Sequence, residues 1–451
     1  MKNLFQFIVR GGLAAALIMR FSVSSGAAAI RPVSHVIHIS VDGLAAVNLQ
    51  DYVTHAPAQF PTFWFLVTNG ASTFNARCDY DNSYTLPNHA SMLTGRPVLQ
   101  PAGQPNTVPH GFTSDAYLPG QNLQNSGNLH VPYKASVFDV THDHGLSTAL
   151  FSSKPKFAMY LESYDATNGA PNPYGRNKVD FNMFTDCGTN PPSYIASTPL
   201  VDCLVDRLTN APWNYIFFHF GDTDWVGHDQ SLGGGWGSPK WSNTVAYVDR
   251  QLGRIFSAIR INPALSHDTA LMVTADHGGG GNLFIYDPIN RAVYGYSHTD
   301  QTQPLNYTIP FFLWGPGIPA GADLYTVLTN RASPGTNRLD YNATPQPIRN
   351  GDAGNLVLAL LGLPAIPGSF MLPELNTVVY PLGFRRAGPA LTVSWPAGAT
   401  GYVLESSEAL GPRAVWQEIH DAITTTGVSS IYTVPDVSQS CAQFFRLRKK
   451  P

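Results

Sequence analysis

The sequence predicts an α/β protein whose mainly parallel sheet is covered by helices on both faces. Short apolar runs alternate with segments in which apolar residues recur at helical spacing, and this alternation is typical of parallel sheets. Three of the runs lead directly into acidic turns: His35–Val41 into Asp42, Asn214–Phe220 into the turn that holds Asp224, and Thr269–Ala275 into Asp276. Because ligands of such sheets bind beyond the carboxyl ends of the strands, we expect these carboxylates to converge at one edge.

The composition fits a large globular protein and excludes one class of partner. The chain has 451 residues, of which 43% are hydrophobic, and its formal net charge is -3. This length supports a sizeable core and more than one domain. A chain without a basic footprint has no electrostatic basis for binding duplex nucleic acid, so such a partner is not expected.

The first 29 residues have the pattern of an export signal. Lys2 and Arg10 are its basic part, Gly11–Met19 its short apolar run, and Ala27–Ala29 its small-residue cleavage site. The run is too short to span a bilayer, and no later segment approaches a membrane span. The sequence therefore predicts a periplasmic or secreted protein with a signal peptide over residues 1–29.

The cysteines do not have the spacing of a thiolate metal site. The four are Cys78, Cys187, Cys203 and Cys441. No two of them form a CxxC motif. Two alternatives remain open for Cys187 and Cys203: a disulfide that closes a short loop after export, or buried unpaired thiols.

The segment from Thr85 to Gly95 predicts a helix that begins at a polar loop. Pro87 suits the first turn, where its missing N–H costs nothing, and Gly95 suits the C-terminal cap. Thr85 then lies at a helix N-terminus, where free N–H groups and the helix dipole favour an anion or an alkoxide. An isolated threonine at such a position is more commonly an ordinary cap, and its neighbours elsewhere in the chain decide between the two interpretations.

The rest of the first 380 residues divides into predicted helices, strands and long loops. Helices are expected over Ala135–His144 and over the segment from Trp241 to Ile259, and a short strand over Thr148–Phe151. The polar stretch Gln100–Pro132 is long enough to indicate a binding-site loop. The irregular stretch Lys154–Pro192 is interpreted as an insertion or lid.

The pattern of apolar and turn residues changes at about residue 381. Short strand-like runs separated by turn residues follow, at Ala390–Trp395, Tyr402–Glu405, Trp416–Ile419, Ser430–Val434 and Phe444–Arg448. Their spacing predicts a small antiparallel β-sandwich. The predicted domains are thus residues 30–380, which carry the candidate chemistry, and a module over 381–451. Contact with carbohydrate or a cell surface and a role as a passive spacer are the alternatives for this module.

A set of carboxylates and imidazoles in the larger domain predicts a metal centre. The candidate ligands are Asp42, Asp224, His228, Asp276, His277 and His298. Asp224 and His228 are four residues apart after a strand, so one turn can present both to a single ion. Asp276 and His277 are adjacent at another strand end. Oxygen and nitrogen donors without thiolates suit zinc or a similar divalent ion, and such an ion activates a nearby threonine hydroxyl.

These motifs resemble the type I phosphodiesterase/nucleotide pyrophosphatase family of the alkaline phosphatase superfamily. The resemblance covers roughly Ser34 to Pro373. It rests on the motifs VDG at 41–43, TLPNH at 85–89, LTG at 93–95, DWVGH at 224–228, ADHG at 275–278 and on His298, with IPFFLWGP at 309–316 and LALLGLP at 358–364 as closing segments.

The resemblance implies an alkaline phosphatase-like fold and an exported hydrolase of phosphodiester or pyrophosphate bonds in a small-molecule phosphoester. It implies two zinc ions, one held by Asp224, His228 and His298, the other by Asp42, Asp276 and His277. Thr85 becomes the nucleophile, approaches the second ion and forms a phospho-threonine intermediate. Asp222, Asp300 and His89 are candidates either for orienting the ligands or for capping local turns.

One stretch departs from the family pattern. The family often has an Asn after His-Gly that donates a hydrogen bond to phosphate, whereas His110-Gly111 is followed by Asp115. An ionised carboxylate repels a phosphate. Either Asp115 is not the equivalent substrate-binding residue, or the anion is bound differently, with Thr113, Ser114 and Lys154 as candidates.

Other functions are weighed against this one. A sulfatase needs Cys or Ser in a CxPxR-like or SxPxR-like setting, which the TLPN stretch lacks. A phosphomonoesterase or phosphonate hydrolase on the same scaffold remains the alternative, although a monoester needs an additional cation and Arg96 follows the Thr85 helix. A catalytically dead exported binding protein is the alternative from another class. It is disfavoured because Thr85 and all six ligand positions are filled.

Overall fold

The computed structural model describes residues 30–104, 108–188, 195–231, 233–375, 382–397, 399, 402–408, 415–420, 422–434 and 443–449. The proposed signal peptide, Cys441 and parts of the two long loops lie outside these residues. The larger unit is built on an eight-stranded sheet in the order β10-β2-β9-β6-β1-β5-β3-β4. Its strands are β1 (His35–Val41), β2 (Ala71–Arg77), β3 (Thr148–Ser152), β4 (Phe181–Phe184), β5 (Tyr215–Phe220), β6 (Thr269–Thr274), β9 (Thr308–Trp314) and β10 (Ala322–Asp323).

The sheet is mainly parallel, as the sequence predicts. Only β9 runs against its neighbours, β2 and β6. Strand β1 lies between β5 and β6, parallel to both, with Val41 opposite Phe220 and Ser40 opposite Thr274. All but one of the residues of these three strands are buried, which explains their nearly continuous apolar sequences. Since the three strands end at the same level, the residues that follow them lie at one edge of the sheet.

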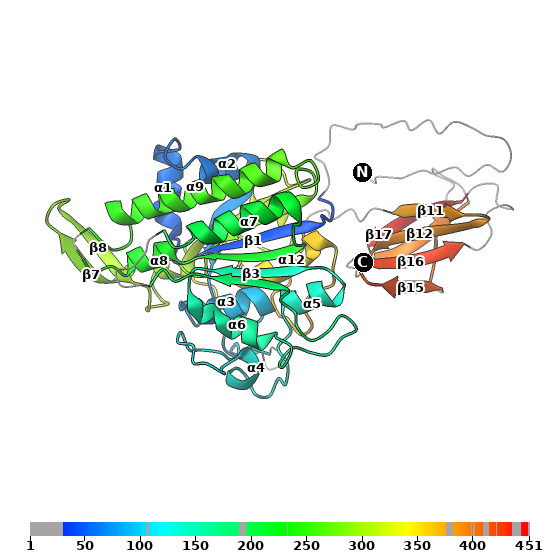
Figure 1. Ribbon diagram of the computed structural model, residues 1–451, viewed down its shortest axis with the longest axis horizontal. Coiled ribbons are helices and arrows are strands. Elements are labelled where there is room, and N and C mark those ends of the chain that lie inside the picture. Colours follow the sequence, from blue (N-terminus) through cyan, green and yellow to red (C-terminus); the bar gives the residue numbers. More distant parts are fainter. Residues whose placement is uncertain are drawn as a thin grey trace.

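Helices cover both faces of the sheet (Figure 1). One face carries α1 (Ala46–His55), α2 (Pro61–Asn69), α7 (Thr198–Asn210) and α9 (Pro239–Ile261), which contact one another. The other face carries α3 (Thr85–Thr94), α5 (Val137–Asp143) and α12 (Ala353–Leu361). The long predicted helix around Trp241 is α9, and the predicted helix at Thr85 is α3, which ends at Gly95 with φ 63°.

The stretch Lys154–Pro192 is less irregular than the sequence suggests. It begins with the 3-10 helix η1 (Pro155–Phe157) and α6 (Ala158–Ser163), and it then supplies β4 to the edge of the main sheet. Strand β4 pairs with β3, and Phe181 packs its ring 4.8 Å from that of Trp213. Residues Phe181–Phe184 of this stretch are therefore an integral edge of the sheet. The sequence signal is weak because β4 has only four residues, none of them buried.

The remaining elements of the larger unit are short. They are α4 (Leu123–Ser126) in the long polar loop, α8 (Asp222–Gly227), α10 (Pro304–Tyr307), α11 (Leu324–Val327), the 3-10 helix η2 (Asn350–Asp352), and the strands β7 (Asn282–Asp287) and β8 (Ala292–Ser297). Strands β7 and β8 form a two-stranded sheet of their own, which projects from the end of the molecule near α8 (Figure 1). None of the helices in the described part of the chain has the length and apolarity needed to cross a membrane.

The C-terminal residues form two small antiparallel sheets. One has the order β11-β12-β16-β15, the other β14-β13-β17. The strands are β11 (Gly383–Ala387), β12 (Ala390–Pro396), β13 (Tyr402–Ser407), β14 (Gln417–Glu418), β15 (Ile423–Thr426), β16 (Ser429–Val434) and β17 (Phe444–Lys449). Val393, Trp395, Leu404 and Phe445 from both sheets share a core separate from the main one. The predicted sandwich is present, with β11 and β15 added to the expected strands.

The cysteines within the described residues are free thiols. Cys187 is buried, and its sulfur lies beside Gly221 and Lys154, whereas Cys203 is half-buried on α7. Of the two alternatives for these residues, the structure therefore has the unpaired thiols.

A buried carboxylate joins two helices of the outer layer. Asp249 of α9 accepts hydrogen bonds from the backbone N–H groups of Thr62 (3.1 Å) and Phe63 (2.7 Å) in the first turn of α2. Burial raises the pKa of Asp249 to about 6, although these two hydrogen bonds act in the opposite direction. The folded protein therefore holds the carboxyl proton of Asp249 more tightly than the unfolded protein does.

We expect Asp249 to make the stability of the protein depend on pH. The stabilising protonation is fully present below the ordinary pKa of 3.8 and is lost as the pH rises through about 6. The free energy of unfolding of the wild type, relative to Asp249→Asn, should fall by up to about 3 kcal/mol over this range. Denaturant unfolding at several pH values measures it, with Asp323→Asn, an exposed cap of α11, as control. Parallel wild-type and Asp249→Asn profiles would contradict the assignment.

Candidate metal centre

The structure brings the predicted ligands together at the edge where β1, β5 and β6 end. Asp42 follows β1, Asp224 lies in α8 with His228 as its C-cap, and Asp276 and His277 follow β6. His298 comes directly after β8, and Thr85 is the first residue of α3. These six ligands and Thr85 are buried residues, apart from the half-buried His228.

The predicted ligands form two groups. In the first, Asp224 Oδ1 lies 3.4 Å from His228 Nε2 and 3.7 Å from His298 Nε2, and the two imidazole Nε2 atoms are 3.0 Å apart. In the second, His277 Nε2 lies 3.4 Å from Asp42 Oδ1 and 3.2 Å from Asp276 Oδ2.

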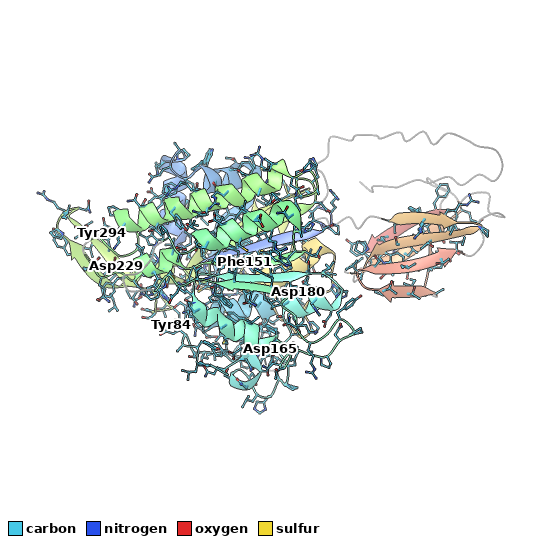
Figure 2. The ribbon with its side chains drawn as sticks, viewed as in Figure 1. Tyr84, Phe151, Asp165, Asp180, Asp229 and Tyr294 are labelled. Atoms are coloured by element: carbon cyan, nitrogen blue, oxygen red, sulfur yellow. The ribbon has the colours of Figure 1, made fainter. Side chains whose placement is uncertain are left out.

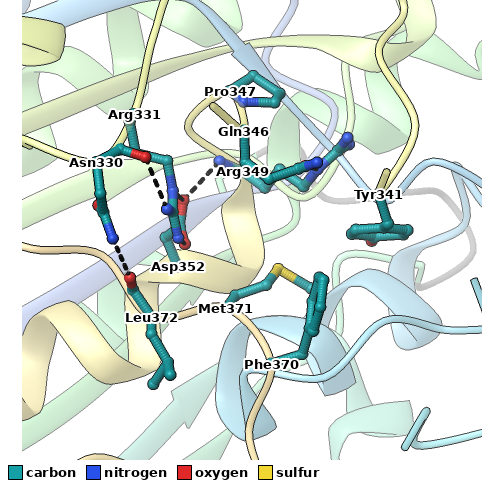
Figure 3. Close-up of a pocket in the computed structure, with 10 residues that line it drawn as sticks. All are labelled: Asn330, Arg331, Tyr341, Gln346, Pro347, Arg349, Asp352, Phe370, Met371 and Leu372. Atoms are coloured by element: carbon teal, nitrogen blue, oxygen red, sulfur yellow. Dashed lines mark hydrogen bonds and ion pairs between the residues drawn. The ribbon is translucent and has the colours of Figure 1, made fainter. Parts of the chain in front are cut away.

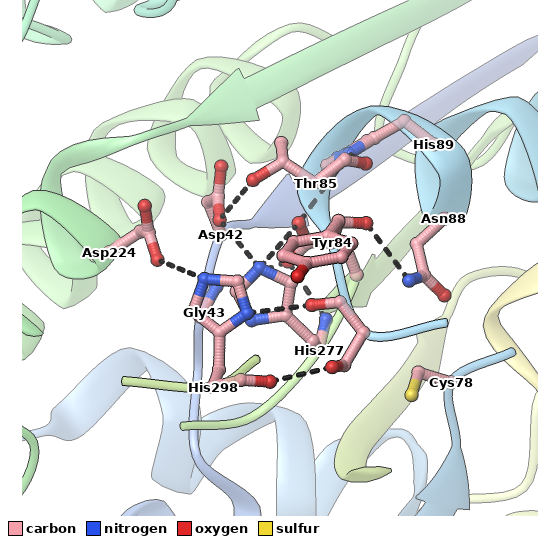
Figure 4. Close-up of polar contacts among 12 residues, drawn as sticks. Asp42, Gly43, Cys78, Tyr84, Thr85, Asn88, His89, Asp224, His277 and His298 are labelled. Carbon is pink, nitrogen blue, oxygen red and sulfur yellow. Dashed lines mark hydrogen bonds and ion pairs between the residues drawn. The ribbon is translucent and has the colours of Figure 1, made fainter. Parts of the chain in front are cut away.

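His277 stands between the two groups. Its ring stacks on that of His298 with 3.7 Å between centroids, and its ligand atom lies within 4.8 Å of those of Asp224 and His298 as well. The Thr85 hydroxyl is 3.5 Å from Asp42 Oδ1, on the side of the second group (Figure 4). The two groups and the hydroxyl thus form one continuous cluster.

Each imidazole of the cluster is oriented by a backbone carbonyl. The Nδ1 atoms lie 2.7 Å from Gly278 O for His277, 2.7 Å from Ser83 O for His298 and 3.1 Å from Tyr296 O for His228. Since a carbonyl oxygen only accepts, Nδ1 carries the hydrogen in each ring. The Nε2 lone pair is therefore directed into the cluster, as in histidines that bind metal ions.

Several buried atoms at the centre have no hydrogen-bond partner among the described residues. They are Asp224 Oδ1, Asp276 Oδ2 and His277 Nε2. The other oxygen of Asp276, Oδ1, accepts from the N–H groups of Gly43 and His277. An unsatisfied buried acceptor is costly, and here the unsatisfied atoms are those that converge. The donor set fits a divalent ion in each group, because carboxylate oxygen and neutral imidazole nitrogen are the ligands that zinc accepts.

Lys154 lies between the two groups. Its ammonium is 2.7 Å from Asp42 Oδ2 and 2.6 Å from Asp224 Oδ2, and it is buried. Each of these carboxylates therefore presents Oδ1 to its group and Oδ2 to the lysine. The predicted role of Lys154 in binding substrate stays untested, but in this structure its ammonium binds the candidate ligands.

The charges of the cluster shift one another's pKa values. Burial alone would raise the pKa of Asp42 and of Asp224. The Lys154 ammonium together with a neighbouring imidazole, His219 beside Asp42 and His228 beside Asp224, outweighs burial and holds both pKa values well below the ordinary value. Burial and the Asp42 carboxylate raise the pKa of Asp276 well above that value. Burial also lowers the pKa of His277 and of His298, so both rings are neutral and available as ligands.

Asp115 lies at the first turn of the Thr85 helix. Its Oδ1 accepts a hydrogen bond from Leu86 N–H at 3.0 Å and pairs with the Lys156 ammonium at 2.9 Å. The carboxylate thus occupies a backbone donor next to Thr85. Ser114, a further candidate for binding the anion, donates its hydroxyl to Ala116 O instead.

The other residues singled out by the sequence have structural partners. His89 uses both ring nitrogens, on Thr85 O and on the Ser40 hydroxyl, so it fixes the first turn of α3. Asp222 accepts from Ser197 at the start of α7, far away in the chain, whereas Asp300 accepts from Thr302 and Gln303 within its own turn. The Arg96 guanidinium donates to Val108 O and Pro367 O.

Two residues of the centre were missed by the sequence analysis. His219 of β5 binds Asp42 Oδ2 through Nε2 at 2.9 Å and the Ser152 hydroxyl through Nδ1. Its sequence signal is an isolated polar residue in an otherwise apolar buried strand.

Trp236 is the second residue. It donates from its indole N–H to Gly43 O, and its ring centroid lies 5.1 Å from that of His228. Gly43 has φ 65°, and a Cβ atom there would lie 3.2 Å from both Asp224 Oδ1 and Trp236.

A cavity of about 240 Å³ lies elsewhere in the larger unit (Figure 3). It is lined by Arg331 and Arg349 among others, but their guanidinium groups are already bound. Arg331 pairs with Asp352, and Arg349 donates to the carbonyl oxygens of Cys78 and Leu339. This cavity is therefore a weaker candidate for anion binding than the metal centre.

Replacing Asp276 by Asn should remove metal from the second group. The variant loses a charged donor whose Oδ2 has no hydrogen-bond partner in the described structure, so we expect at least a tenfold loss of affinity. Metal content after dialysis against graded chelator measures this. Asp139→Asn is the matched control, because this buried carboxylate accepts from Ser136 at the cap of α5 and from the Tyr133 hydroxyl and contacts no candidate ligand. Equal metal content in both variants would contradict the assignment.

Replacing Lys154 by Met should destabilise the metal-free protein by about 3–5 kcal/mol, because it leaves two buried carboxylates without their counter-ion. Lys156→Met breaks a partly exposed pair with Asp115 and should cost at most about 1 kcal/mol. Denaturant unfolding in chelator measures both, and equal stability of the two variants would refute the counter-ion role.

Comparison with known proteins agrees with the motifs. The sequence model of the family described as type I phosphodiesterase/nucleotide pyrophosphatase matches residues 130–294. This stretch contains Asp224, His228, Asp276 and His277. None of the curated proteins matches the chain.

Solved structures that are similar to this chain include the following three. An inactive form of murine ectonucleotide pyrophosphatase/phosphodiesterase 5 in complex with AMP is 16% identical, with 74% of this chain and 96% of that chain covered and a TM-score of 0.44. A Vibrio parahaemolyticus protein of the alkaline phosphatase superfamily is 13% identical, with 87% and 84% covered and a TM-score of 0.44. The C-terminal periplasmic domain of Escherichia coli EptC is 12% identical, with 74% and 84% covered and a TM-score of 0.42. The match of the family model confirms that this chain resembles the type I phosphodiesterase/nucleotide pyrophosphatase family.

Proposed function

We propose that this protein is a metal-dependent phosphodiesterase or pyrophosphatase that uses Thr85 as its nucleophile. The observation that carries the proposal is the pair of ligand groups whose unsatisfied atoms converge beside the Thr85 hydroxyl. When bound, two divalent ions, with zinc as the best fit to the donors, supply positive charge that lowers the pKa of a hydroxyl and stabilises negative charge at phosphorus.

The residues of the chain supply position and orientation. Thr85 directs its hydroxyl toward Asp42 and is held by the first turn of α3, which His89 ties to Ser40. Attack of Thr85 Oγ1 on phosphorus forms a Thr–phosphate ester as the bond to the leaving oxygen breaks, and a water then hydrolyses this ester. The N-terminus of α3 faces the anion with the positive end of its dipole.

The cations near the centre favour a diester over a monoester. Lys154 is paired with Asp42 and Asp224, and Lys156 with Asp115. Arg96, the candidate that a phosphomonoesterase needs, binds carbonyl oxygens. A diester carries a single negative charge, so its binding site needs fewer positive charges than that of a dianionic monoester.

Hydrolysis of bis-p-nitrophenyl phosphate and of p-nitrophenyl phosphate tests the proposal. We expect the purified protein to prefer the diester, and chelator to abolish turnover, because no side chain replaces the charge of the metal ions. Preference for the monoester would favour the phosphatase alternative. A protein that binds no metal would refute the proposal, and one that binds metal but cleaves neither ester would refute it for simple diesters.

Thr85→Ala should lower kcat at least about a thousandfold while metal content stays at the wild-type level. The hydroxyl forms the bond to phosphorus, whereas six other side chains supply the metal donors. Thr94→Ala, in the last turn of the same helix, is the control, because this hydroxyl donates to Ala90 O and contacts no candidate ligand. Native turnover by the Thr85→Ala protein would exclude Thr85 as the nucleophile.

A further inference from the structure

The β7–β8 hairpin exposes an unusual concentration of apolar side chains. Leu283, Phe284, Tyr286, Ile289 and Val293 each expose between 55% and 73% of their surface. These five belong to one hairpin of the chain, which pairs with no other strand among the described residues. Figure 2 shows the side chains of this projecting hairpin, with Tyr294 labelled. Contiguous exposed apolar surface of this kind marks an interaction site.

The exposed side chains lie mainly on one face of the hairpin and in its turn. Phe284, Tyr286 and Val293 share one face, because Tyr286 is directly opposite Val293 and lies two residues from Phe284. Ile285 and Tyr294 form a half-buried pair on the other face. Ile289 lies in the turn, and Leu283 has a positive φ of 53°, so that it and Phe284 are both exposed.

This distribution decides which partner can cover the hairpin. Five side chains that each expose about three fifths of roughly 200 Å² offer roughly 600 Å², and only part of this lies on one face. A standard interface with a folded partner buries about 800 Å² per side, polar and apolar surface counted together, and the apolar side chains on one face of the hairpin supply only part of that area. A lipid interface, by contrast, surrounds an inserted tip and covers both faces and the turn together.

The turn of the hairpin exposes one cationic side chain. Arg291 in the turn is exposed, whereas the Asp287 carboxylate is buried and accepts hydrogen bonds from the N–H groups of Ile289 and Asn290. The positive charge is thus presented outward and the negative charge is used within the turn. Tyr286 and Tyr294 have the apolar ring and polar tip that suit the headgroup region of a bilayer.

The hairpin is also fixed to the metal centre. His277 precedes β7, and His298 directly follows β8. Gly295 O accepts from Trp236 N–H at 2.8 Å, and Tyr296 O accepts from the His228 ring. A surface bound by the hairpin is therefore held beside the cluster.

We propose that the β7–β8 hairpin docks this protein on an anionic phospholipid surface. The aromatic and aliphatic side chains enter the headgroup region, and Arg291 binds lipid phosphate. The consequence that the enzyme acts on phosphodiesters carried by such a surface rests on the proposed function, but the docking itself does not.

Sedimentation with unilamellar vesicles tests the docking without turnover. We expect the full-length protein to bind vesicles of phosphatidylcholine and phosphatidylglycerol at 4:1. The double variant Phe284→Ser/Ile289→Ser should bind at least tenfold more weakly. Arg291→Gln should bind these vesicles about fivefold more weakly and pure phosphatidylcholine vesicles as the wild type does. Ile261→Ser is the matched control, because Ile261 at the end of α9 is 74% exposed and Ile289 is 73% exposed.

Each outcome decides the proposal. It is overturned if the wild type binds neither kind of vesicle, or if the double variant binds as well as Ile261→Ser. It is also overturned if the wild type is a dimer and the double variant is a monomer, because the hairpin then contacts a second copy of the chain. A protein that binds vesicles through the hairpin but cleaves no phosphoester would support docking and refute the proposed function, whereas the reverse result would refute docking alone.

Discussion

The centre depends on one buried interaction, the bond of the Lys154 ammonium to both Asp42 and Asp224. Parallel strands bring several carboxylates to one edge of the sheet, and like charges in a buried place repel one another. The ammonium offsets this repulsion and also fixes geometry, since it takes Oδ2 of each carboxylate and leaves Oδ1 for the metal group. Without it, the two carboxylates would lose the counter-ion that they share.

The ligands are held by backbone more than by one another. The three imidazoles each donate to a carbonyl oxygen, and Asp276 accepts from two backbone N–H groups. Such contacts follow from strand ends and tight turns, which are rigid, so they orient the donor atoms toward one another. Thr85 is positioned in the same way, by the first turn of α3. The centre is thus preorganised by the sheet edge itself.

The edge of the sheet that carries the ligands also carries the segments that surround the centre. The β7–β8 hairpin connects His277 to His298, so a projecting element lies between two ligands of the cluster. The Asp115–Lys156 pair covers the first turn of α3. It joins the long polar loop Gln100–Pro132, which contains Asp115, to η1, which contains Lys156. The hairpin and the centre are therefore joined by a few residues of chain.

The strands before Asp42, Asp224 and Asp276, the helix at Thr85 and the C-terminal sandwich were all readable from local pattern, because apolar periodicity and cap residues act within a few positions. The convergence of the ligands also followed from the sequence, since parallel strands share one edge. The binding of Lys154 to two ligands, the role of His219 and the exposure of the β7–β8 side chains were not readable. Each depends on neighbours far away in the chain, as Lys154 lies 112 residues from Asp42 and 70 from Asp224. Such pairings arise only when packing excludes water and brings charges that are distant in the sequence within reach of one another. Tertiary structure alone therefore decided them.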